Sequence, residues 1–241
     1  MILLENKDPI GRALKDYYQA GEAEPITVLL DIAEDDVMEP GYFFREYDQC
    51  PELEQIALKN ARGKVLDVGG GAGSHSLYLQ KNGVDVTTLD ISPNSVDVMK
   101  ERGLKNVLLT DFYDYSASTF DTLLFLMNGI GLVSTLDGFD EFFKQARKLM
   151  NPKGQILLDS SDLIYLYEQK DGSYLIDLSE KYHGEVEFSL SYKDIKGEPF
   201  KWLYISHELL ADAAEENGFK CEILKEGEHY DYLARLTVID Q

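Results

Sequence analysis

The residues best suited to bind a ligand are glycines within residues 64–78, whose sequence is KVLDVGGGAGSHSLY. The apolar stretch 65–68 predicts a short buried strand, and Ser74 can cap a helix that follows. Between the two stand four glycines, Gly69, Gly70, Gly71 and Gly73. Glycine lets the backbone turn tightly and lets a ligand approach closely. This order of strand, glycine turn and helix indicates a nucleotide-type site in an open α/β sheet.

The spacing of the glycines indicates the class of ligand. A nicotinamide or flavin fingerprint, G-x-G-x-x-G, requires its third glycine at position 74, where the chain has Ser74. The pattern is instead D-x-G-x-G-x-G, formed by Asp67, Gly69, Gly71 and Gly73. An acid inside the strand suits a cationic ligand better than a pyrophosphate. S-adenosylmethionine is such a ligand, since it carries a sulfonium and an ammonium but no phosphate.

This stretch resembles motif I of the class I S-adenosylmethionine-dependent methyltransferases. The resemblance implies S-adenosylmethionine as the cofactor and methyl transfer by in-line displacement. It also implies that Asp67 and the three alternate glycines of the motif contact the cofactor. The segment RKLMNPKGQILLD at 147–159 resembles the family's approach to its fifth strand, which supports the resemblance independently of motif I.

Two acids follow predicted strands farther along the chain. Asp90 stands about twenty residues after the glycine loop, where a ribose-binding carboxylate belongs. The alternative is that Asp90 only precedes Ser92, the cap of the next helix. The resemblance further implies that Ile91 flanks the adenine, that Asp111 takes the adenine amino group, and that the main chain of Phe112 meets the ring.

The stretch 120–127, FDTLLFLM, is nearly continuous in apolar residues, as a central parallel strand should be. The stretch 128–131, NGIG, ends this strand and resembles motif IV, which lies beside the transferred methyl group. The resemblance thus implies that Met127 and Asn128 contact the cofactor. Gly129 follows Asn128, so the chain departs from the [D/N]-P-P-[Y/F] motif of amino-group methyltransferases. This departure disfavours methylation of DNA bases or glutamine.

The resemblance also implies that two segments can cover the substrate, because the family often uses the segment before motif I and an insertion after the fifth strand in this way. In the aromatic segment 42–47, Tyr42, Arg45 and Tyr47 are predicted to face the ligand, or else to pack the N-terminal extension onto the sheet. Residues 161–205 predict a β-hairpin inserted between the fifth strand and the next helix. His183 and Trp202 are its substrate candidates, with a purely structural hairpin as the alternative.

A general base is required only if the acceptor must lose a proton. His75 lies in the first turn after the glycine loop and is the catalytic candidate. Its alternative is a contact with the cofactor carboxylate or with solvent. The acceptor atom is not determined by the sequence.

These patterns predict an α/β, Rossmann-like three-layer sandwich. Its seven-stranded sheet is mostly parallel, and its last strand is antiparallel. We expect one domain over residues 1–241. It divides into an N-terminal helical extension at 1–50, a cofactor-binding core at 51–160, the inserted hairpin at 161–205, and a helix with closing strands at 206–241.

Composition limits the partners of the chain. With 241 residues, 44% apolar residues and a formal net charge of -21, it is unsuited to binding nucleic-acid phosphates or an anionic membrane. Cys50 and Cys221 match no metal-binding spacing, so we expect reduced thiols, no metal and a cytoplasmic location. No signal peptide and no membrane span is predicted. A small-molecule acceptor is the expected partner.

Other functions remain open from the sequence. A nicotinamide-dependent oxidoreductase is opposed by the glycine spacing and by Asp67. An aminopropyl transferase should carry extra acids where this chain has Asn128 and Gly129. A non-catalytic protein that binds S-adenosylmethionine is the third alternative, because methyl transfer requires few obligatory side chains.

Overall fold

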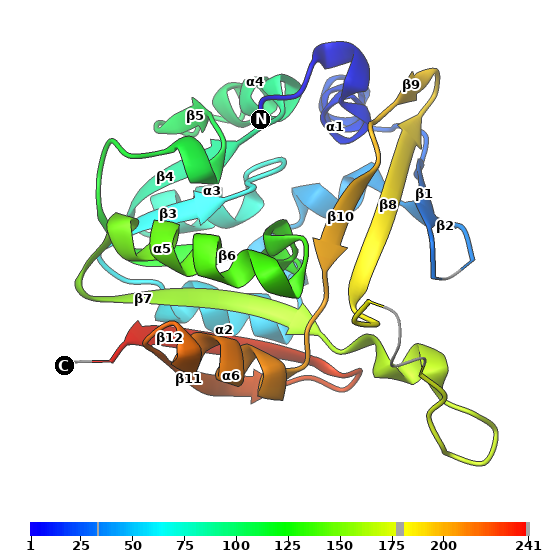
Figure 1. The fold of residues 1–241 in the computed structure, drawn as a ribbon. Helices are drawn as coiled ribbons and strands as arrows, with labels where there is room; N and C mark the ends of the chain where they lie inside the picture. Colours follow the sequence, from blue (N-terminus) through cyan, green and yellow to red (C-terminus); the bar gives the residue numbers. More distant parts are fainter. Residues whose placement is uncertain (33, 177–180, 240–241) are drawn as a thin grey trace.

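The computed structural model describes residues 1–32, 34–176 and 181–239, and its centre is a seven-stranded sheet (Figure 1). The strand order is β11-β12-β7-β6-β3-β4-β5. The strands are β3 (Lys64–Val68), β4 (Asp85–Asp90), β5 (Val107–Leu109), β6 (Phe120–Phe125), β7 (Met150–Ser161), β11 (Phe219–Glu226) and β12 (Asp231–Val238). Only β12 runs antiparallel to its neighbours, β7 and β11. The predicted architecture of this sheet is confirmed.

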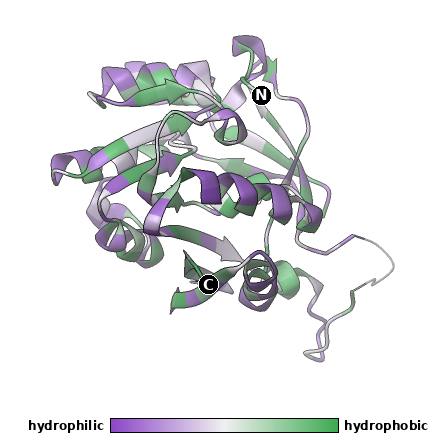
Figure 2. Ribbon diagram, turned by 60° about the vertical axis from the view of Figure 1, so that its left-hand side comes forward, coloured by the Kyte–Doolittle hydropathy of each residue, from purple (hydrophilic) through white to green (hydrophobic). Residues whose placement is uncertain are grey.

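Helices cover both faces of this sheet, which makes three layers. On one face lie α2 (Glu52–Asn60), α3 (Ser74–Lys81) and α4 (Pro93–Glu101); on the other lie α5 (Phe139–Leu149) and α6 (His207–Glu216). Figure 2 shows that the helices carry both hydrophilic and hydrophobic residues. In α5, Phe139, Phe142 and Phe143 recur at helical spacing and are at most 3% exposed, because that face packs on the sheet.

A second, antiparallel sheet stands beside the first, in the order β10-β8-β1-β2, with β9 paired to β8 (Figure 1). Its strands are β1 (Ile26–Leu30), β2 (Asp36–Met38), β8 (Glu185–Tyr192), β9 (Ile195–Lys196) and β10 (Phe200–Leu203). The predicted hairpin is present as β8 and β10. The extension predicted as helical is only partly so, because β1 and β2 join that hairpin: Val28 pairs with Leu190.

The helix of the extension, α1 (Pro9–Ala20), is tied to α4 by a buried polar network. Asp8 caps α1 by accepting a hydrogen bond from the amide of Gly11 at 2.9 Å. The hydroxyl of Ser92 donates to the same carboxylate at 2.5 Å, and the side-chain amide of Asn94 donates at 3.0 Å. Asp8 is completely buried, so these bonds fix the extension against the cofactor core.

Short 3-10 helices connect many of these elements. They are η1 (Glu5–Lys7), η2 (Pro40–Phe44), η3 (Tyr47–Gln49), η4 (Phe112–Asp114), η5 (Gly129–Val133), η6 (Leu136–Gly138) and η7 (Leu163–Tyr167). Within the described ranges, no helix has the length and apolar character needed to cross a membrane.

Candidate active site

The glycine loop joins β3 to α3 through left-handed backbone. Gly69 has φ 78° and Gly71 has φ 56°, conformations that side-chain-bearing residues rarely adopt. The amide of Gly69 donates to the carbonyl of Leu89 at 2.9 Å, which holds the loop against β4. A Cβ added at Gly69 would meet nothing within 4 Å. The loop therefore leaves open space where the sequence predicts a bound cofactor.

Asp67 lies beneath this loop. Its side chain is 2% exposed and accepts a hydrogen bond from the hydroxyl of Ser76 at 2.6 Å. Ser76 in turn accepts from the hydroxyl of Thr88 at 2.7 Å. Burial raises the pKa of Asp67 above its ordinary value. The acid thus connects β3, α3 and β4, and its direct contact with a cofactor stays a prediction.

The predicted capping role of Ser74 is wrong. The residue at the N-cap of α3 is Gly73, whose φ of 85° is left-handed. The hydroxyl of Ser74 donates instead to the carbonyl of Phe43 at 2.7 Å. Ser74 therefore fixes the aromatic segment of the extension against the glycine loop.

The carboxylate of Asp90 is hydrogen-bonded both to the glycine loop and to the start of α4. One carboxylate oxygen accepts from the amide of Gly71 at 2.9 Å, and the other accepts from the amide of Ser92 at 2.8 Å. Burial raises the pKa of Asp90 to about 6, against the lowering effect of these bonds. The carboxylate thus stands between the glycine loop and the start of α4, and its binding to ribose stays a prediction.

Residues predicted to bind adenine lie together at the ends of β4 and β5. Ile91 is 37% exposed, and its carbonyl accepts from the amide of Leu3 at 3.0 Å. Asp111 accepts from the amide of Tyr113 at 3.0 Å and also contacts the amino group of Met1. The ring of Phe112 is 4% exposed within the core, so its main chain is the part left to meet a ligand.

The end of β6 is held in unusual backbone. Met127 has φ 63° and Asn128 has φ 55°, and two successive left-handed residues other than glycine are costly. The amide of Asn128 donates to Asp159 at 2.9 Å, and its side chain accepts from Ser161 at 3.3 Å. Its carbonyl accepts from Nε1 of Trp202 at 3.0 Å. These bonds from β7 and β10 stabilise the strained turn.

Asp159 was missed by the sequence analysis. It follows the buried residues of β7, directly beside the end of β6, so its place at the end of a predicted strand was the available signal. Burial raises its pKa to about 7; the charge of Glu54 adds to this rise, whereas the Asn128 amide and His75 oppose it. A half-buried carboxyl group with this pKa can exchange a proton near neutral pH.

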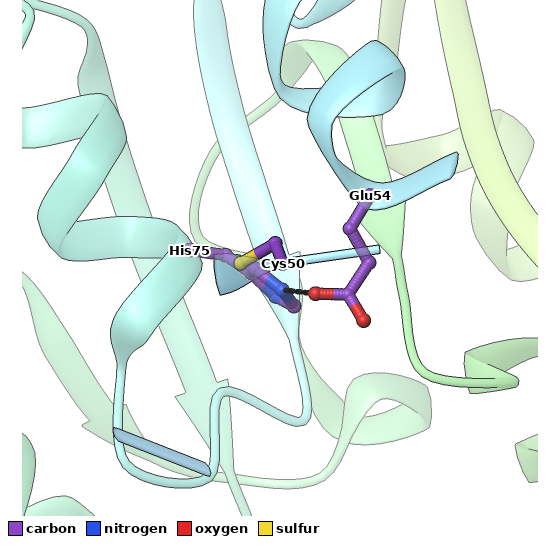
Figure 3. A group of neighbouring side chains, drawn as sticks. All are labelled: Cys50, Glu54 and His75. Carbon is purple, nitrogen blue, oxygen red and sulfur yellow. Dashed lines mark hydrogen bonds and ion pairs between the residues drawn. The ribbon is translucent and has the colours of Figure 1, made fainter. Parts of the chain in front are cut away.

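A second missed residue is Glu54, the centre of an ion cluster at the start of α2 (Figure 3). It is 3% exposed. Nη2 of Arg45 donates to both of its carboxylate oxygens, at 2.7 and 2.8 Å. Nε2 of His75 lies 2.7 Å from one of them. Burial would raise the pKa of Glu54, but these two partners hold it below its ordinary value.

The same cluster sets the charge of His75. Burial lowers the pKa of His75, but the neighbouring Cys50, the hydrogen bond with Glu54 and the charges of Asp67 and Glu54 raise it to about 10. The imidazole is therefore protonated at neutral pH, and a protonated imidazole cannot accept a proton from an acceptor. This charge state favours a positioning role for His75 over the predicted catalytic one.

Cys50, Glu54 and His75 have their donor atoms within 4.8 Å of one another, close enough for metal ligands (Figure 3). Glu54 is already bound by two cationic groups, Arg45 and His75. A metal ion would have to displace these cations from the carboxylate. The arrangement is thus that of an ion cluster.

The predicted substrate residues of the extension separate into two groups. Arg45 lies 3.4 Å from the ring centroid of Tyr42, and its buried Nε has no hydrogen-bond partner in the described part of the chain. Tyr47 instead stacks on Tyr78 of α3, with centroids 4.3 Å apart. Tyr42 and Arg45 thus join the ion cluster, whereas the ring of Tyr47 packs the extension onto α3.

The two candidates from the inserted segment separate in the same way. Trp202 lies at the turn formed by Asn128. Nε2 of His183 lies 3.0 Å from Asp162, beyond the end of β7, and its ring contacts Tyr167 and Tyr182. These partners of His183 belong to neither the glycine loop nor the ion cluster.

Known proteins resemble this chain in both sequence and structure. The family described as "Methyltransferase domain" matches residues 43–222. A solved SAM-dependent methyltransferase from Bacteroides fragilis, in complex with S-adenosyl-L-homocysteine, is 46% identical. The alignment covers 99% of this chain and 98% of that one, with a TM-score of 0.94.

More distant proteins match part of this chain. The putative methyltransferase YqeM of Bacillus subtilis is 23% identical over 140 residues, and the match spans 56% of each chain, so just over half of the length of that protein. The CcbJ methyltransferase of Streptomyces caelestis is 18% identical, with a TM-score of 0.58 over 80% of this chain and 95% of that one.

Proposed function

Since this chain belongs to the class I S-adenosylmethionine-dependent methyltransferases, we propose that it methylates a small molecule held beneath its second sheet. The enzyme class and the cofactor follow from the family and from the homologue with bound S-adenosyl-L-homocysteine. The size of the acceptor is the proposal. The observation that carries it is the hydrogen bond from Trp202 to Asn128, because this bond holds β10 over the end of β6.

The residues at the loop suit this cofactor. Open space adjoins Gly69, and Arg45 offers a buried Nε that lacks a partner among the described residues. Asp90 would hold the ribose, Asp111 the adenine amino group, and Arg45 with His75 the methionine carboxylate. The bound cofactor supplies a sulfonium-activated methyl group.

The protein's own contribution is alignment. In-line displacement requires the acceptor atom, the methyl carbon and the sulfur to lie on one line, and fixed geometry lowers the barrier to that encounter. The backbone turn at Met127 and Asn128 is held by Asp159 and Trp202, so the wall of the reaction site is rigid.

Charge and enclosure both favour a small acceptor. The net charge of -21 repels nucleic acid. The end of β6 lies between β10 of the second sheet and the ends of the neighbouring strands, which limits access for a folded macromolecule.

The proposal is tested by transfer of a radioactive methyl group from S-adenosylmethionine into a cell extract, followed by ultrafiltration. We expect enzyme-dependent label in the small-molecule filtrate and none in retained protein or nucleic acid. Label confined to the retained fraction would overturn the proposal. The variant Asp90→Asn, expected to lose cofactor affinity, controls for transfer by enzymes of the extract.

A further inference from the structure

Four aromatic side chains form a continuous surface on the second sheet, here called the aromatic wall. It consists of Phe188, Phe200, Trp202 and Tyr204. Phe188 stacks on Phe200 with centroids 5.6 Å apart, and Phe200 meets Trp202 edge-on at 6.0 Å. Positions 200, 202 and 204 alternate along one chain segment and share a face, whereas Leu203 between them is fully buried in the core.

The aromatic wall and Asp159 meet at one residue. The carbonyl of Asn128 accepts from Trp202 at 3.0 Å, and the amide of Asn128 donates to Oδ1 of Asp159 at 2.9 Å. Burial chiefly, with the charges of Tyr165 and then Asp159 in addition, raises the pKa of Tyr204 to about 12. The two hydrogen bonds of Asn128 thus link the carboxylate to the aromatic wall at the end of β6, where methyl transfer is proposed.

Neither group has a cationic partner in the described part of the chain. No lysine or arginine there lies over a ring of the aromatic wall, and Asp159 forms no ion pair. The nearby cations Arg45 and His75 are bound to Glu54. A carboxylate beside aromatic faces is an arrangement that attracts an ammonium group.

We infer that the acceptor is an amine with an apolar body, which rests on the aromatic wall while Asp159 receives the proton of its nitrogen. This inference rests on the proposed function and names the acceptor class of the same site. It makes Asp159 a catalytic residue, in contact with the reacting nitrogen.

The ammonium form of the acceptor gives one proton to the free oxygen of Asp159 and becomes a neutral amine. The nitrogen lone pair then forms the N–C bond as the S–C bond breaks, and the S–C electron pair stays on sulfur. The product leaves as a methylated ammonium ion, and Asp159 returns its proton to water.

The protonation behaviour of Asp159 is consistent with this role. A general base works best when its pKa lies near the working pH, and that of Asp159 is raised to about 7. The titratable groups that face it from neighbouring elements are Glu54 of α2, His75 of α3, Tyr42 of η2, Tyr204 after β10 and Tyr232 of β12.

Trp202 is the sole tryptophan of the chain, so its fluorescence reports binding at the aromatic wall without any turnover. The experiment titrates the protein, saturated with S-adenosylhomocysteine, with primary amines of increasing apolar size, from ethylamine to 2-phenylethylamine. Each amine is compared with its matched alcohol. We expect at least one amine to bind about ten-fold or more tightly than its alcohol, because only the amine pairs with Asp159.

Two variants test whether Asp159 causes the tighter binding of amines. Asp159→Asn should abolish it, whereas Asp140→Asn, the same change at an exposed position of α5, should retain it. The inference is overturned if no amine binds better than its alcohol, or if Asp159→Asn keeps the preference. Whether any amine binds better than its alcohol is measured on the wild-type protein alone, so this test holds even if a variant folds poorly.

Calorimetry with S-adenosylhomocysteine on the same samples separates the two claims. Binding of S-adenosylhomocysteine without any amine preference would overturn the amine inference and leave methyl transfer to a small molecule standing. Absence of S-adenosylhomocysteine binding would instead contradict the proposed function itself.

Discussion

Nε1 of Trp202 donates a hydrogen bond to the carbonyl of Asn128 at 3.0 Å, across 74 positions of the sequence. This bond joins the second sheet to the end of β6. The indole also leaves no room for a side chain at position 131, because a Cβ added to Gly131 would lie 2.0 Å from Nε1. The cofactor core and its cover are thus held in one fixed arrangement at the turn where methyl transfer is proposed.

The variant Trp202→Phe keeps an aromatic ring but removes the donor. We expect the free energy of unfolding to fall by about 1 kcal/mol, because the carbonyl of Asn128 loses its partner. Hydrogen exchange of the amides in η5 should become faster, as measured by mass spectrometry. Phe200→Leu, which removes no hydrogen bond, is the control and should leave η5 unchanged. Unchanged exchange in Trp202→Phe would show that the bond does not hold the two sheets together.

Gly69→Ala tests whether the open space at the glycine loop belongs to the cofactor. Gly83 is a matched control, since its φ of 81° is close to the 78° of Gly69 and an added Cβ meets nothing within 4 Å at either position. Both substitutions should cost about 1 kcal/mol of stability for left-handed alanine. Only Gly69→Ala should weaken S-adenosylhomocysteine binding, by about ten-fold or more. Equal affinities of the two variants would place the cofactor elsewhere.

Asp90→Asn tests the ribose assignment. Loss of the charge should weaken S-adenosylhomocysteine binding by about 1–3 kcal/mol, because the ribose hydroxyls lose an ionised acceptor. Asp85→Asn, at the exposed opposite end of β4, should bind normally. Calorimetry measures both affinities, and circular dichroism verifies the fold. Normal affinity in a folded Asp90→Asn protein would refute the assignment.

The sequence was sufficient where local patterns decide the structure. The glycine spacing and the apolar strands predicted the central sheet, the loop and the positions of Asp90 and Asp111. It was insufficient where distant segments pair. The apolar run at 26–30 shows strand tendency, but its pairing of Val28 with Leu190 depends on tertiary packing.

The contacts of individual side chains at the site also depend on distant segments, so the sequence did not predict them. Ser74 was expected to cap α3, but the left-handed Gly73 begins that helix and leaves the hydroxyl free for Phe43. Glu54 is one of two acids in the first turn of α2, and no local pattern distinguishes it from Glu52. Its role appears only once folding brings Arg45 and His75 to it.

The charge of His75 is open to direct measurement. Because its pKa is raised from 6.5 to about 10, its ion pairs contribute stability that is complete below 6.5 and is lost as the pH rises to about 10. Imidazole resonances in NMR spectra should therefore show His75 protonated at about pH 8. Glu54→Gln should return its pKa toward the ordinary value. A neutral His75 at that pH in the wild type would reopen its predicted role as a base.

Asp159→Asn should reveal the raised pKa of Asp159 as a pH-dependent gain in stability. The folded-state pKa of Asp159 is raised from 3.8 to about 7, so the folded protein retains a proton there that the unfolded chain releases. Ionisation thus lowers stability as the pH rises through this window. The variant should gain about 1–2 kcal/mol in urea denaturation above pH 7 and little near pH 4. A variant that is less stable than the wild type above pH 7 would contradict this account.

The central claim is that the glycine loop binds S-adenosylmethionine in an active methyltransferase. Calorimetric titration of the purified protein with S-adenosylhomocysteine tests it most directly, with NADH as a parallel control. We expect micromolar binding of S-adenosylhomocysteine and no binding of NADH. Binding of NADH alone, or of neither ligand, would contradict it.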